Sequence, residues 1–556
     1  MHLPRPTTTC RRRFPRGAVP VLPAPKLLAL VVLAMAFLLA PHTAAQDDAP
    51  FDLLIRGGRL VDGTGNPWVR GDVAVRGDRI ARIGHLPDAV AERVIDAAGL
   101  VVAPGFVDPH THAVRGIYDV PTADNYLLQG VTTLTEGNDG ASPWPVGEHL
   151  ARIAATRISP NWAVFAGQGT IRRRVLGNEE REPTRDELER MRTLVARAME
   201  EGALGLSTGL FYVPGSFADT AEIIALAEVA GRHGGIYISH MRDEALRLLD
   251  SVRETIRIGE EAAVPVQMTH HKAVSRDMWG RSAESLALVD AARARGVDIT
   301  IDQYPYTASQ TSITAVVPQW AQAGGTGELI ERLRDPETRR RIREEIVYRI
   351  EHDRGGGDPA NIVIGLSSWD RSLEGRSLAD ILIGRGVEPT VATAADLVME
   401  IVERGGARAI YHAMDEGDVE RIMRHPATAI GSDGGISVFG ESVPHPREYG
   451  TFARVLGRYV RDRGVLTLEE AVRKMSAATA QRIGLRARGL LREGFFADIA
   501  VFDPERVIDR ATFEQPHQYA EGVEYVLVNG VVVVDAGEHT GARPGRVLYG
   551  PGRRSP

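Results

Sequence analysis

Two histidines one residue apart, His110 and His112, have the types and spacing that could do chemistry. They close the stretch Pro-Gly-Phe-Val-Asp-Pro-His-Thr-His at 104–112, and the apolar residues before them are typical of a buried strand. On an extended backbone, side chains at positions i and i+2 point the same way. Two such imidazoles can bind one metal ion from one side. A lone histidine in an apolar strand is more often a packed core residue, so further ligands are needed.

Further candidate ligands follow, each at the end of an apolar run. His240, His270 and Asp433 all stand in this position. Taken singly, His240 or His270 could be a packed histidine, but the coincidence of the whole set at strand ends favours a shared site. Four imidazoles and a carboxylate that converge suit a divalent ion of the zinc type.

The chemistry of such a site is the activation of water. A divalent cation lowers the pKa of bound water from about 16 to about 7 and polarises a carbonyl oxygen. A nearby carboxylate can take the water's proton and return it to a leaving nitrogen, and Asp433 is the candidate for this general base and acid. The sequence has no phosphate-binding glycine loop and no dinucleotide fingerprint.

The elements that must position these residues alternate between apolar strands and amphipathic helices. Beside the strand before His110, we predict strands at 131–136, 162–166, 203–207, 236–240, 266–271, 297–304 and 427–433. Helical patterns lie between them, for example at 185–201, 221–232 and 246–261. Eight alternations indicate an α/β fold of the (β/α)8 TIM-barrel type, in which the chemistry lies at the carboxyl ends of the strands.

A long gap between the seventh and eighth strands interrupts this pattern. It contains a charged helical run at 335–354, followed by Gly355-Gly356-Gly357. A simple loop of this length would be unusual. We therefore predict an insertion over the barrel mouth at about 313–400.

Both ends of the chain are rich in short β signals. In the segment 51–102, residues 79–84 alternate polar and apolar positions. The β character returns from Gly489, with an Asn529-Gly530 turn between two apolar runs. We expect the segments 46–103 and 486–550 to form one small domain together, with the barrel occupying 104–485.

The first 45 residues read as a targeting segment. An apolar run at 27–40 follows basic residues, is short for a membrane-spanning helix, and precedes Thr43-Ala44-Ala45. These features predict a signal peptide at 1–45, export to the periplasm or the exterior, and no stable membrane anchor after cleavage. A retained anchor is the alternative, and the arginine-rich start leaves Sec and Tat export both open.

Composition narrows the function further. The 556 residues carry a formal net charge of −7 with no concentrated basic face in the folded part, which gives no indication of a nucleic-acid partner. The only cysteine, Cys10, precedes the apolar run. The chain after cleavage would therefore have no disulfide, no thiolate ligand and no cysteine nucleophile.

At this point the chain resembles the amidohydrolase superfamily and, within it, the N-acyl-D-amino-acid deacylases (D-aminoacylases), over nearly all of its length after the signal peptide. The stretch at 104–112 is the superfamily's entry motif. More specific motifs are Gly209-Leu210-Phe211-Tyr212-Val213-Pro214-Gly215, His240-Met241-Arg242-Asp243-Glu244, His270-His271-Lys272, Asp302-Gln303-Tyr304-Pro305-Tyr306, Gly431-Ser432-Asp433-Gly434, His445-Pro446-Arg447 and the closing run from 528 to 546.

The resemblance implies a (β/α)8 barrel, a β-sandwich built from both chain ends, and one or two zinc ions. The ligands it implies are Asp139, His240 and His270 for a tighter site and His110, His112 and Asp433 for a looser one. The substrate-binding residues it implies are Tyr212, Lys272, Tyr304 and Arg447, with Tyr306 as an alternative to Tyr304. Lys272 could instead be a snorkelling surface lysine, and Arg447 an exposed loop residue.

One position departs from the family. The best-known D-aminoacylases carry a cysteine where this chain has Asp139. Aspartate can bind zinc at about 2.0–2.2 Å and can bridge two ions. Glu136 is a rival ligand, and Asp139 could also serve only the Asn138-Asp139-Gly140 turn. The number and identity of the metal ions stay open.

The leading hypothesis is an exported, zinc-dependent hydrolase of the amide bond of N-acyl-D-amino acids, a small-molecule substrate with a free carboxylate. The alternatives are a dipeptidase for a C-terminal D-residue and a cyclic-amide hydrolase of the hydantoinase type. A cyclic amide needs less carboxylate recognition, so Arg447 and Lys272 argue against it. A catalytically inactive binding module is a further alternative, against which stands the presence of all central ligands. The D configuration rests on the resemblance alone.

Overall fold

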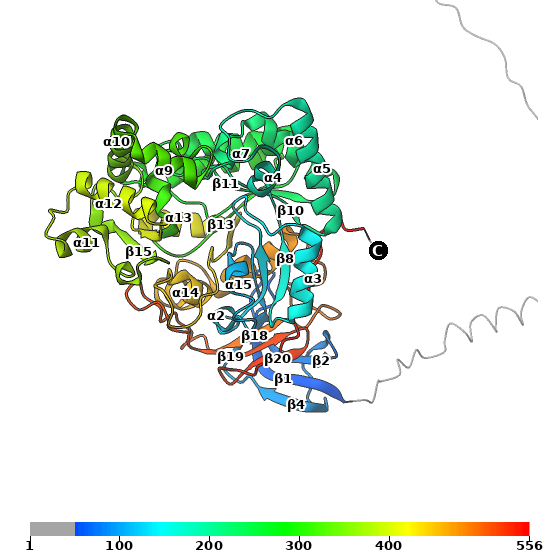
Figure 1. The fold of residues 1–556 in the computed structure, drawn as a ribbon. Coiled ribbons are helices and arrows are strands. Elements are labelled where there is room, and N and C mark those ends of the chain that lie inside the picture. Colours follow the sequence, from blue (N-terminus) through cyan, green and yellow to red (C-terminus); the bar gives the residue numbers. More distant parts are fainter. Residues whose placement is uncertain (1–49, 555–556) are drawn as a thin grey trace, which may run out of the picture. The chain divides into compact units, whose positions relative to one another are not determined.

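The computed structural model describes residues 50–554, so the predicted signal peptide at 1–45 lies outside the described residues. In the described part, none of the helices combines the length and the hydropathy that crossing a membrane requires. Figure 1 shows the arrangement of the elements from Phe51 onwards.

Both chain ends contribute to one sheet of nine strands. Its order is β21-β20-β19-β18-β5-β1-β2-β3, with β4 beside β1. The strands are β1 (Phe51–Leu60), β2 (Val69–Arg76), β3 (Arg79–Gly84), β4 (Ala91–Asp96), β5 (Val101–Pro104), β18 (Ile499–Phe502), β19 (Val523–Val528), β20 (Val531–Asp535) and β21 (Glu538–His539). β5 and β18 pair antiparallel with Val102 opposite Val501, which joins the two chain ends as expected.

The hairpin between β19 and β20 follows from its turn residues. Asn529 and Gly530 both have positive φ, 48° and 81°, as a two-residue hairpin turn with matching twist requires. A Cβ on Gly530 would come within 2.0 Å of the Gly77 carbonyl oxygen. Glycine is therefore needed here for both backbone conformation and space.

Between these segments, parallel strands alternate with helices in chain order. One parallel sheet contains β6 (Phe106–Asp108), β7 (Val131–Glu136) and β8 (Asn161–Val164); another contains β9 (Ala166–Gly167), β10 (Gly205–Gly209), β11 (Ile236–His240), β12 (Val266–Met268), β13 (Ile299–Gln303) and β17 (Thr428–Ile430). Only Phe165 separates β8 from β9, and an isolated parallel bridge joins Thr111 to Gly434 beyond β6 and β17. The chain is thus a mixed α/β protein with strands at all eight predicted places.

The helices that accompany these strands begin and end at recognisable signals. They are α2 (Asp124–Leu127), α3 (Val146–Thr156), α4 (Gln168–Leu176), α5 (Arg185–Glu201), α6 (Thr220–Arg232), α7 (Leu248–Ala262), α8 (Ser282–Ala294), α13 (Glu416–Arg424), α14 (Arg447–Arg454), α15 (Leu468–Met475) and α16 (Ala477–Arg482). At the start of α5, Thr184 and Glu187 form a reciprocal capping box, and Gly202 ends the helix in the left-handed region.

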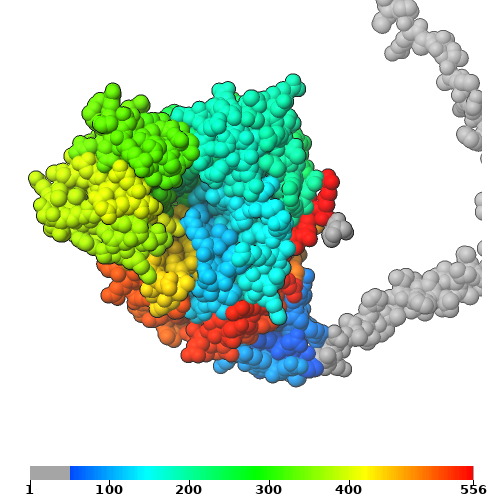
Figure 2. All heavy atoms as spheres, viewed as in Figure 1, coloured from blue at the N-terminus to red at the C-terminus, as the bar shows by residue number. Residues whose placement is uncertain are grey.

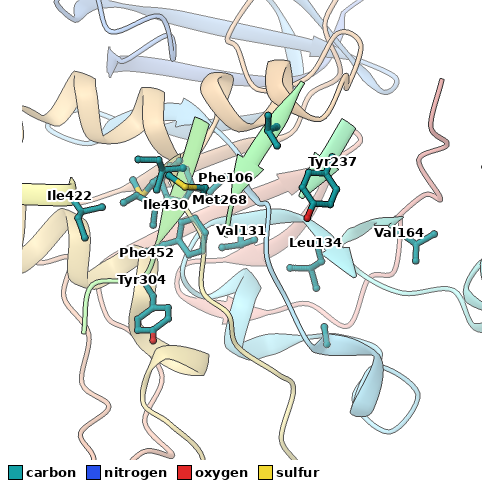
Figure 3. Close-up of a cluster of buried hydrophobic side chains, with 14 of the residues drawn as sticks. Phe106, Val131, Leu134, Val164, Tyr237, Met268, Tyr304, Ile422, Ile430 and Phe452 are labelled. Carbon is teal, nitrogen blue, oxygen red and sulfur yellow. The ribbon is translucent and has the colours of Figure 1, made fainter. Parts of the chain in front are cut away.

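The strands stand on a continuous apolar core. Figure 3 shows Phe106, Val131, Leu134 and Met268 among its buried side chains. Phe106 stacks on Phe452 with ring centroids 5.8 Å apart. Burying one such side chain stabilises the fold by about 1.5–3 kcal/mol. This packing holds the strands rigid, so the polar residues at their carboxyl ends have fixed positions.

Between β13 and β17 lies a separate antiparallel sheet with its own helices, which together form the insertion. Its strands are β14 (Ser309–Ser312), β15 (Ile362–Leu366) and β16 (Arg408–Tyr411), in the order β14-β16-β15, and its helices are α9 (Thr326–Arg334), α10 (Pro336–His352), α11 (Leu378–Gly384) and α12 (Val391–Glu403). These elements run from 309 to 411, whereas the predicted limits were about 313–400. The polar sequence of β14 carries no strand signal, because pairing with β16 rather than an apolar pattern makes it extended.

Three predicted strands are shorter than expected. The prediction of 266–271 is wrong beyond Met268, where β12 ends, and the strands at 297–304 and 427–433 are also trimmed. After Met268 the backbone leaves the ladder because the His270 amide donates to the Asp302 carboxylate, 2.7 Å away. His270 consequently lies in a turn with φ +35°.

Candidate metal centre and active site

The His-x-His pair is fixed by an aspartate that ties two strand ends together. Oδ1 of Asp108 accepts the backbone N–H groups of His110 and of Ser432, each at 3.0 Å. The amide of Asp433 in turn donates to the His110 carbonyl at 2.8 Å. The ends of β6 and β17, far apart in sequence, are therefore held side by side, which brings His110 and His112 to Asp433.

The six predicted ligands come together in two overlapping groups. His110, His112, Asp139 and Asp433 form one group, and Asp139, His240 and His270 form the other; within each, one ligating atom per residue lies within 4.8 Å of all the others. Asp139 belongs to both groups. Its Oδ2 is 3.3 Å from His112 Nε2, and its Oδ1 is 3.5 Å from His270 Nε2. A carboxylate in this position can serve one metal ion or bridge two.

Glu136, the rival of Asp139, is engaged elsewhere. One of its carboxylate oxygens accepts the Val114 amide at 2.8 Å and the other accepts the Gly137 amide at 2.9 Å. Glu136 belongs to neither ligand group. Asp139 does occupy a turn, with φ +54°. That turn aims its carboxylate at the histidines, so the turn and a ligand role are compatible.

The donor set fits a metal ion. Nε2 of His110 and Oδ1 of Asp139 are buried, and among the described residues neither has a hydrogen-bond partner. His240 Nδ1 and His270 Nε2 face each other at 2.7 Å. Buried polar atoms without partners are costly, and a cation shared among imidazoles and carboxylates would satisfy them. Imidazole nitrogens and carboxylate oxygens are ligands that zinc accepts.

Glu244, a residue to which the sequence reasoning gave no role, stands behind the two histidines of the second group. Its Oε1 accepts a hydrogen bond from Lys272 Nζ at 2.6 Å and lies 3.0 Å from His270 Nδ1. Its Oε2 lies 3.8 Å from His240 Nε2. Burial would raise the pKa of Glu244, but Lys272 and His270 hold that pKa well below its usual range. An ionised carboxylate here orients both imidazoles from the side away from the metal position.

Asp433, the predicted general base, stays ionised because cations surround it. Its Oδ1 is 3.1 Å from His112 Nε2, and its Oδ2 is 2.8 Å from Arg447 Nη1. Burial would raise the pKa of Asp433, but Arg447 and His110 hold that pKa well below its usual range. The side chain is thus available as a proton acceptor near neutral pH.

A cavity of about 360 Å³ opens over both ligand groups, and three of the four predicted substrate-binding residues line it: Tyr212, Lys272 and Tyr304. Figure 2 shows the surface hollowed between the green-to-yellow residues of the insertion and the blue-to-teal residues. Arg447 does not line this cavity; its guanidinium lies over the Tyr304 ring, 4.6 Å from the centroid. Tyr306 points elsewhere and donates to the Pro446 carbonyl, so Tyr304 is the better placed tyrosine.

The insertion supplies cavity-lining residues that the sequence did not predict. Arg354, Gln310 and Arg408 line it from this side, and Arg115 and Arg173 from the other. The glycine run that follows Arg354 was the only sequence signal near any of them. A larger hollow of about 690 Å³, bordered by α7 and α10, contains none of the predicted site residues.

Comparisons with known proteins agree with this geometry. The model of the family described as "Amidohydrolase family" matches residues 93–534. A D-aminoacylase of Alcaligenes xylosoxydans xylosoxydans is 39% identical and covers 90% of this chain and 98% of its own. The crystal structure of an N-acyl-D-glutamate deacylase from Bordetella bronchiseptica, complexed with zinc and a phosphonate inhibitor that mimics the tetrahedral intermediate, is 35% identical. It covers 90% of this chain and 100% of its own, with a TM-score of 0.78.

A solved D-aminoacylase, described for the functional role of its binuclear metal centre, is 37% identical over 90% of this chain and 100% of its own, with a TM-score of 0.77. Identities above 30% extend over nine-tenths of the sequence in each of these cases. This chain therefore belongs to the amidohydrolase family and, within it, to the D-aminoacylases.

Proposed function

We propose that this protein hydrolyses the amide bond of N-acyl-D-amino acids, releasing a carboxylate and a free D-amino acid, with one or two zinc ions as cofactor. The observation that carries the proposal is the pair of ligand groups sharing Asp139 at the floor of a cavity that Tyr212 and Lys272 also line. The similarity to D-aminoacylase and to N-acyl-D-glutamate deacylase supports the same reaction.

Zinc would be held by His110, His112, Asp139, His240, His270 and Asp433. Bound there, zinc supplies an acidified water and polarises the scissile carbonyl. Asp433 accepts the water's proton on its carboxylate and returns it to the leaving nitrogen. Arg447 keeps Asp433 ionised and oriented between turnovers.

The substrate's α-carboxylate needs a cationic or hydroxyl partner beside the metal position. Tyr212 and Tyr304 line the cavity, and the Tyr212 hydroxyl lies 3.0 Å from Thr311 Oγ1. The Lys272 ammonium also lines it and is already balanced by Glu244. Nη1 of Arg447 is taken by Asp433, but its Nε has no hydrogen-bond acceptor among the described residues, which supports its predicted role as a second partner. A planar guanidinium can bind a carboxylate with two parallel hydrogen bonds.

We also infer the finer architecture. The eight parallel strand positions would close as a (β/α)8 barrel, with the Thr111–Gly434 bridge and the near-continuity of β8 and β9 joining the two parallel sheets. The nine-stranded sheet would be the β-sandwich of both chain ends. Solved hydantoinases with a TM-score of 0.53 at 16% identity support this fold and nothing more specific.

The test is a screen of the zinc-loaded protein against paired D- and L-N-acetyl amino acids, dipeptides with a C-terminal D-residue, and hydantoins. We expect turnover of the D-acetyl compounds with an excess over the L-enantiomers of at least about a hundredfold, since a misplaced contact of about 2.7 kcal/mol gives that factor. Preferred hydrolysis of dipeptides, or of hydantoins, would replace the proposal by the corresponding alternative.

We further propose that the protein is exported and cleaved near residue 45, so that it acts outside the cytoplasm without a membrane anchor. The sequence features at 27–45 support this proposal. Amino-terminal sequencing of the protein from the exported fraction should give a start near Gln46. Recovery of a chain in the membrane fraction that still carries residues 27–40 would contradict it.

A further inference from the structure

One wall of the catalytic cavity is made by the insertion, and Arg408 stands at its centre. Arg408 is the first residue of β16, where it pairs with Ser312 of β14 on one side and with Leu366 of β15 on the other. All three residues line the cavity. Since β16 is the middle strand of this sheet, the position of Arg408 is fixed from both sides.

Within the described part of the chain, Arg408 has no acidic partner, in contrast to the two cations at the metal-binding floor. Lys272 is balanced by Glu244, and Arg447 by Asp433. Among residues 50–554, by contrast, no carboxylate lies within ion-pairing distance of the Arg408 guanidinium, whose one hydrogen bond goes to Gln310 Oε1 at 3.4 Å.

The surroundings make this lone charge costly. Burial, with Arg115 and Arg447 nearby, lowers the pKa of Arg408 to about 10, so the guanidinium is still charged at neutral pH. Taking a charge out of water without a counterion is unfavourable. A partly buried, charged guanidinium that the protein itself leaves without a carboxylate is a place where a ligand's anion would be favourable.

The region beyond Arg408 has the same sign of charge. A second hollow of about 460 Å³ adjoins the catalytic cavity, and the two share Arg173, Val213, Ser312, Leu366 and Arg408. None of the described residues that line this outer hollow is acidic. Of the carboxylates of the catalytic cavity, Asp139 and Asp433 belong to the metal-binding floor, and Glu244 lies behind it, next to His270.

We propose that Arg408 binds a second anionic group of the substrate, so that the preferred substrates are N-acyl-D-amino acids with a carboxylate in addition to the α-carboxylate. This inference rests on the proposed deacylase function and deepens it. The second carboxylate has two chemical sources, the side chain of the D-residue or the far end of the acyl group. The guanidinium would bind it with two parallel hydrogen bonds, which fixes orientation as well as charge.

The experiment compares three substrates that differ in this group alone: N-acetyl-D-leucine, N-acetyl-D-glutamate and N-succinyl-D-leucine. Each is assayed with the zinc-loaded parent and with Arg408→Met, Arg408→Lys and the control Arg340→Met, whose arginine is exposed on α10 and pairs with Glu344. Zinc content and thermal stability of each variant confirm that it is folded. N-acetyl-D-glutamate tests the side-chain source, and N-succinyl-D-leucine tests the acyl source.

We expect the parent to prefer one dianionic substrate, and Arg408→Met to lower the ratio of its kcat/KM to that of N-acetyl-D-leucine by about 10–100-fold. Arg408→Lys should recover part of the ratio, and Arg340→Met should leave it unchanged.

Two results would overturn the inference, and they differ in what they say of the function. If the parent hydrolyses N-acetyl-D-leucine and Arg408→Met slows all three substrates equally, Arg408 is structural while the deacylase function stands. If the parent hydrolyses none of the three, both the proposed function and this inference are wrong.

Discussion

The floor of the cavity and Arg408 on its insertion wall differ in how their charges are paired. At the floor, carboxylates and cations come in contact: Asp433 with Arg447, Glu244 with Lys272, and Asp139 with the histidines. On the wall, Arg408 has no carboxylate within ion-pairing distance among residues 50–554. The floor is assembled in advance for chemistry, whereas the wall keeps a cation available for a ligand.

The two arrangements follow from what each region must do. A reaction repeated on many substrates needs groups whose positions and protonation states are fixed before binding. Selectivity instead needs a group that the substrate can pair and the protein does not. A group already paired within the protein adds little to the binding of one substrate over another. Four substitutions at the floor test whether its groups are fixed for the reaction in this way. They follow from the largest expected effect to the smallest.

The largest effect is expected from Asp433→Asn. The amide keeps the shape of the side chain but cannot accept the proton of water, and general-base catalysis contributes about 10²–10⁴-fold to a rate. We expect kcat to fall by that range in a folded protein, measured with the best substrate. A fall of less than about tenfold would remove Asp433 from the role of base.

Asp139→Ala should remove metal as well as rate, because Asp139 contributes to both ligand groups. Zinc per chain is measured after dialysis, with Glu136→Gln as the matched control, since Glu136 accepts only backbone amides. Asp139→Cys, which introduces the residue of the best-known D-aminoacylases, should restore zinc binding because a thiolate is a good zinc ligand. If Glu136→Gln loses zinc and Asp139→Ala keeps it, the ligand assignment must be exchanged.

Glu244→Gln should weaken zinc binding without removing any ligand. Losing a carboxylate that orients a metal-binding imidazole typically costs about 10–100-fold in metal affinity or activity. Competition with a chelator of known affinity measures the change. An unaltered zinc affinity would mean that Glu244 serves mainly to balance Lys272.

Arg447→Lys tests whether a cation of the floor also contributes to substrate selectivity. Arg447 pairs with Asp433 and is also proposed to bind the α-carboxylate of the substrate. We expect kcat/KM for an N-acyl-D-amino acid to fall about tenfold more than for its carboxamide, since lysine lacks the planar fork that a carboxylate accepts. Both are assayed with parent and variant. An equal loss on the two substrates would assign Arg447 to the support of Asp433 alone.

Much of the architecture follows from local sequence. The apolar runs between amphipathic helices placed strands at all eight predicted positions, and the prediction of 185–201 agrees with α5 because Thr184, Glu187 and Gly202 mark both ends. His-x-His and the later strand-end residues also predicted five of the six ligands that the structure brings together, and the family resemblance added Asp139. These features can be predicted from the sequence because hydrophobic periodicity and helix capping depend on residues that are close together in the chain.

What the sequence could not decide depends on contacts between distant segments. The trimming of the predicted 266–271 strand depends on Asp302, and the freedom of Arg408 depends on which carboxylates other segments bring near it. Glu244 and Lys272 are 28 residues apart, yet they form an ion pair behind His270. The sequence determines the charge of a side chain, but the tertiary structure determines which group lies beside it. Only the tertiary structure therefore determined that Lys272 and Arg447 are paired with carboxylates at the floor and that Arg408, among the described residues, is not.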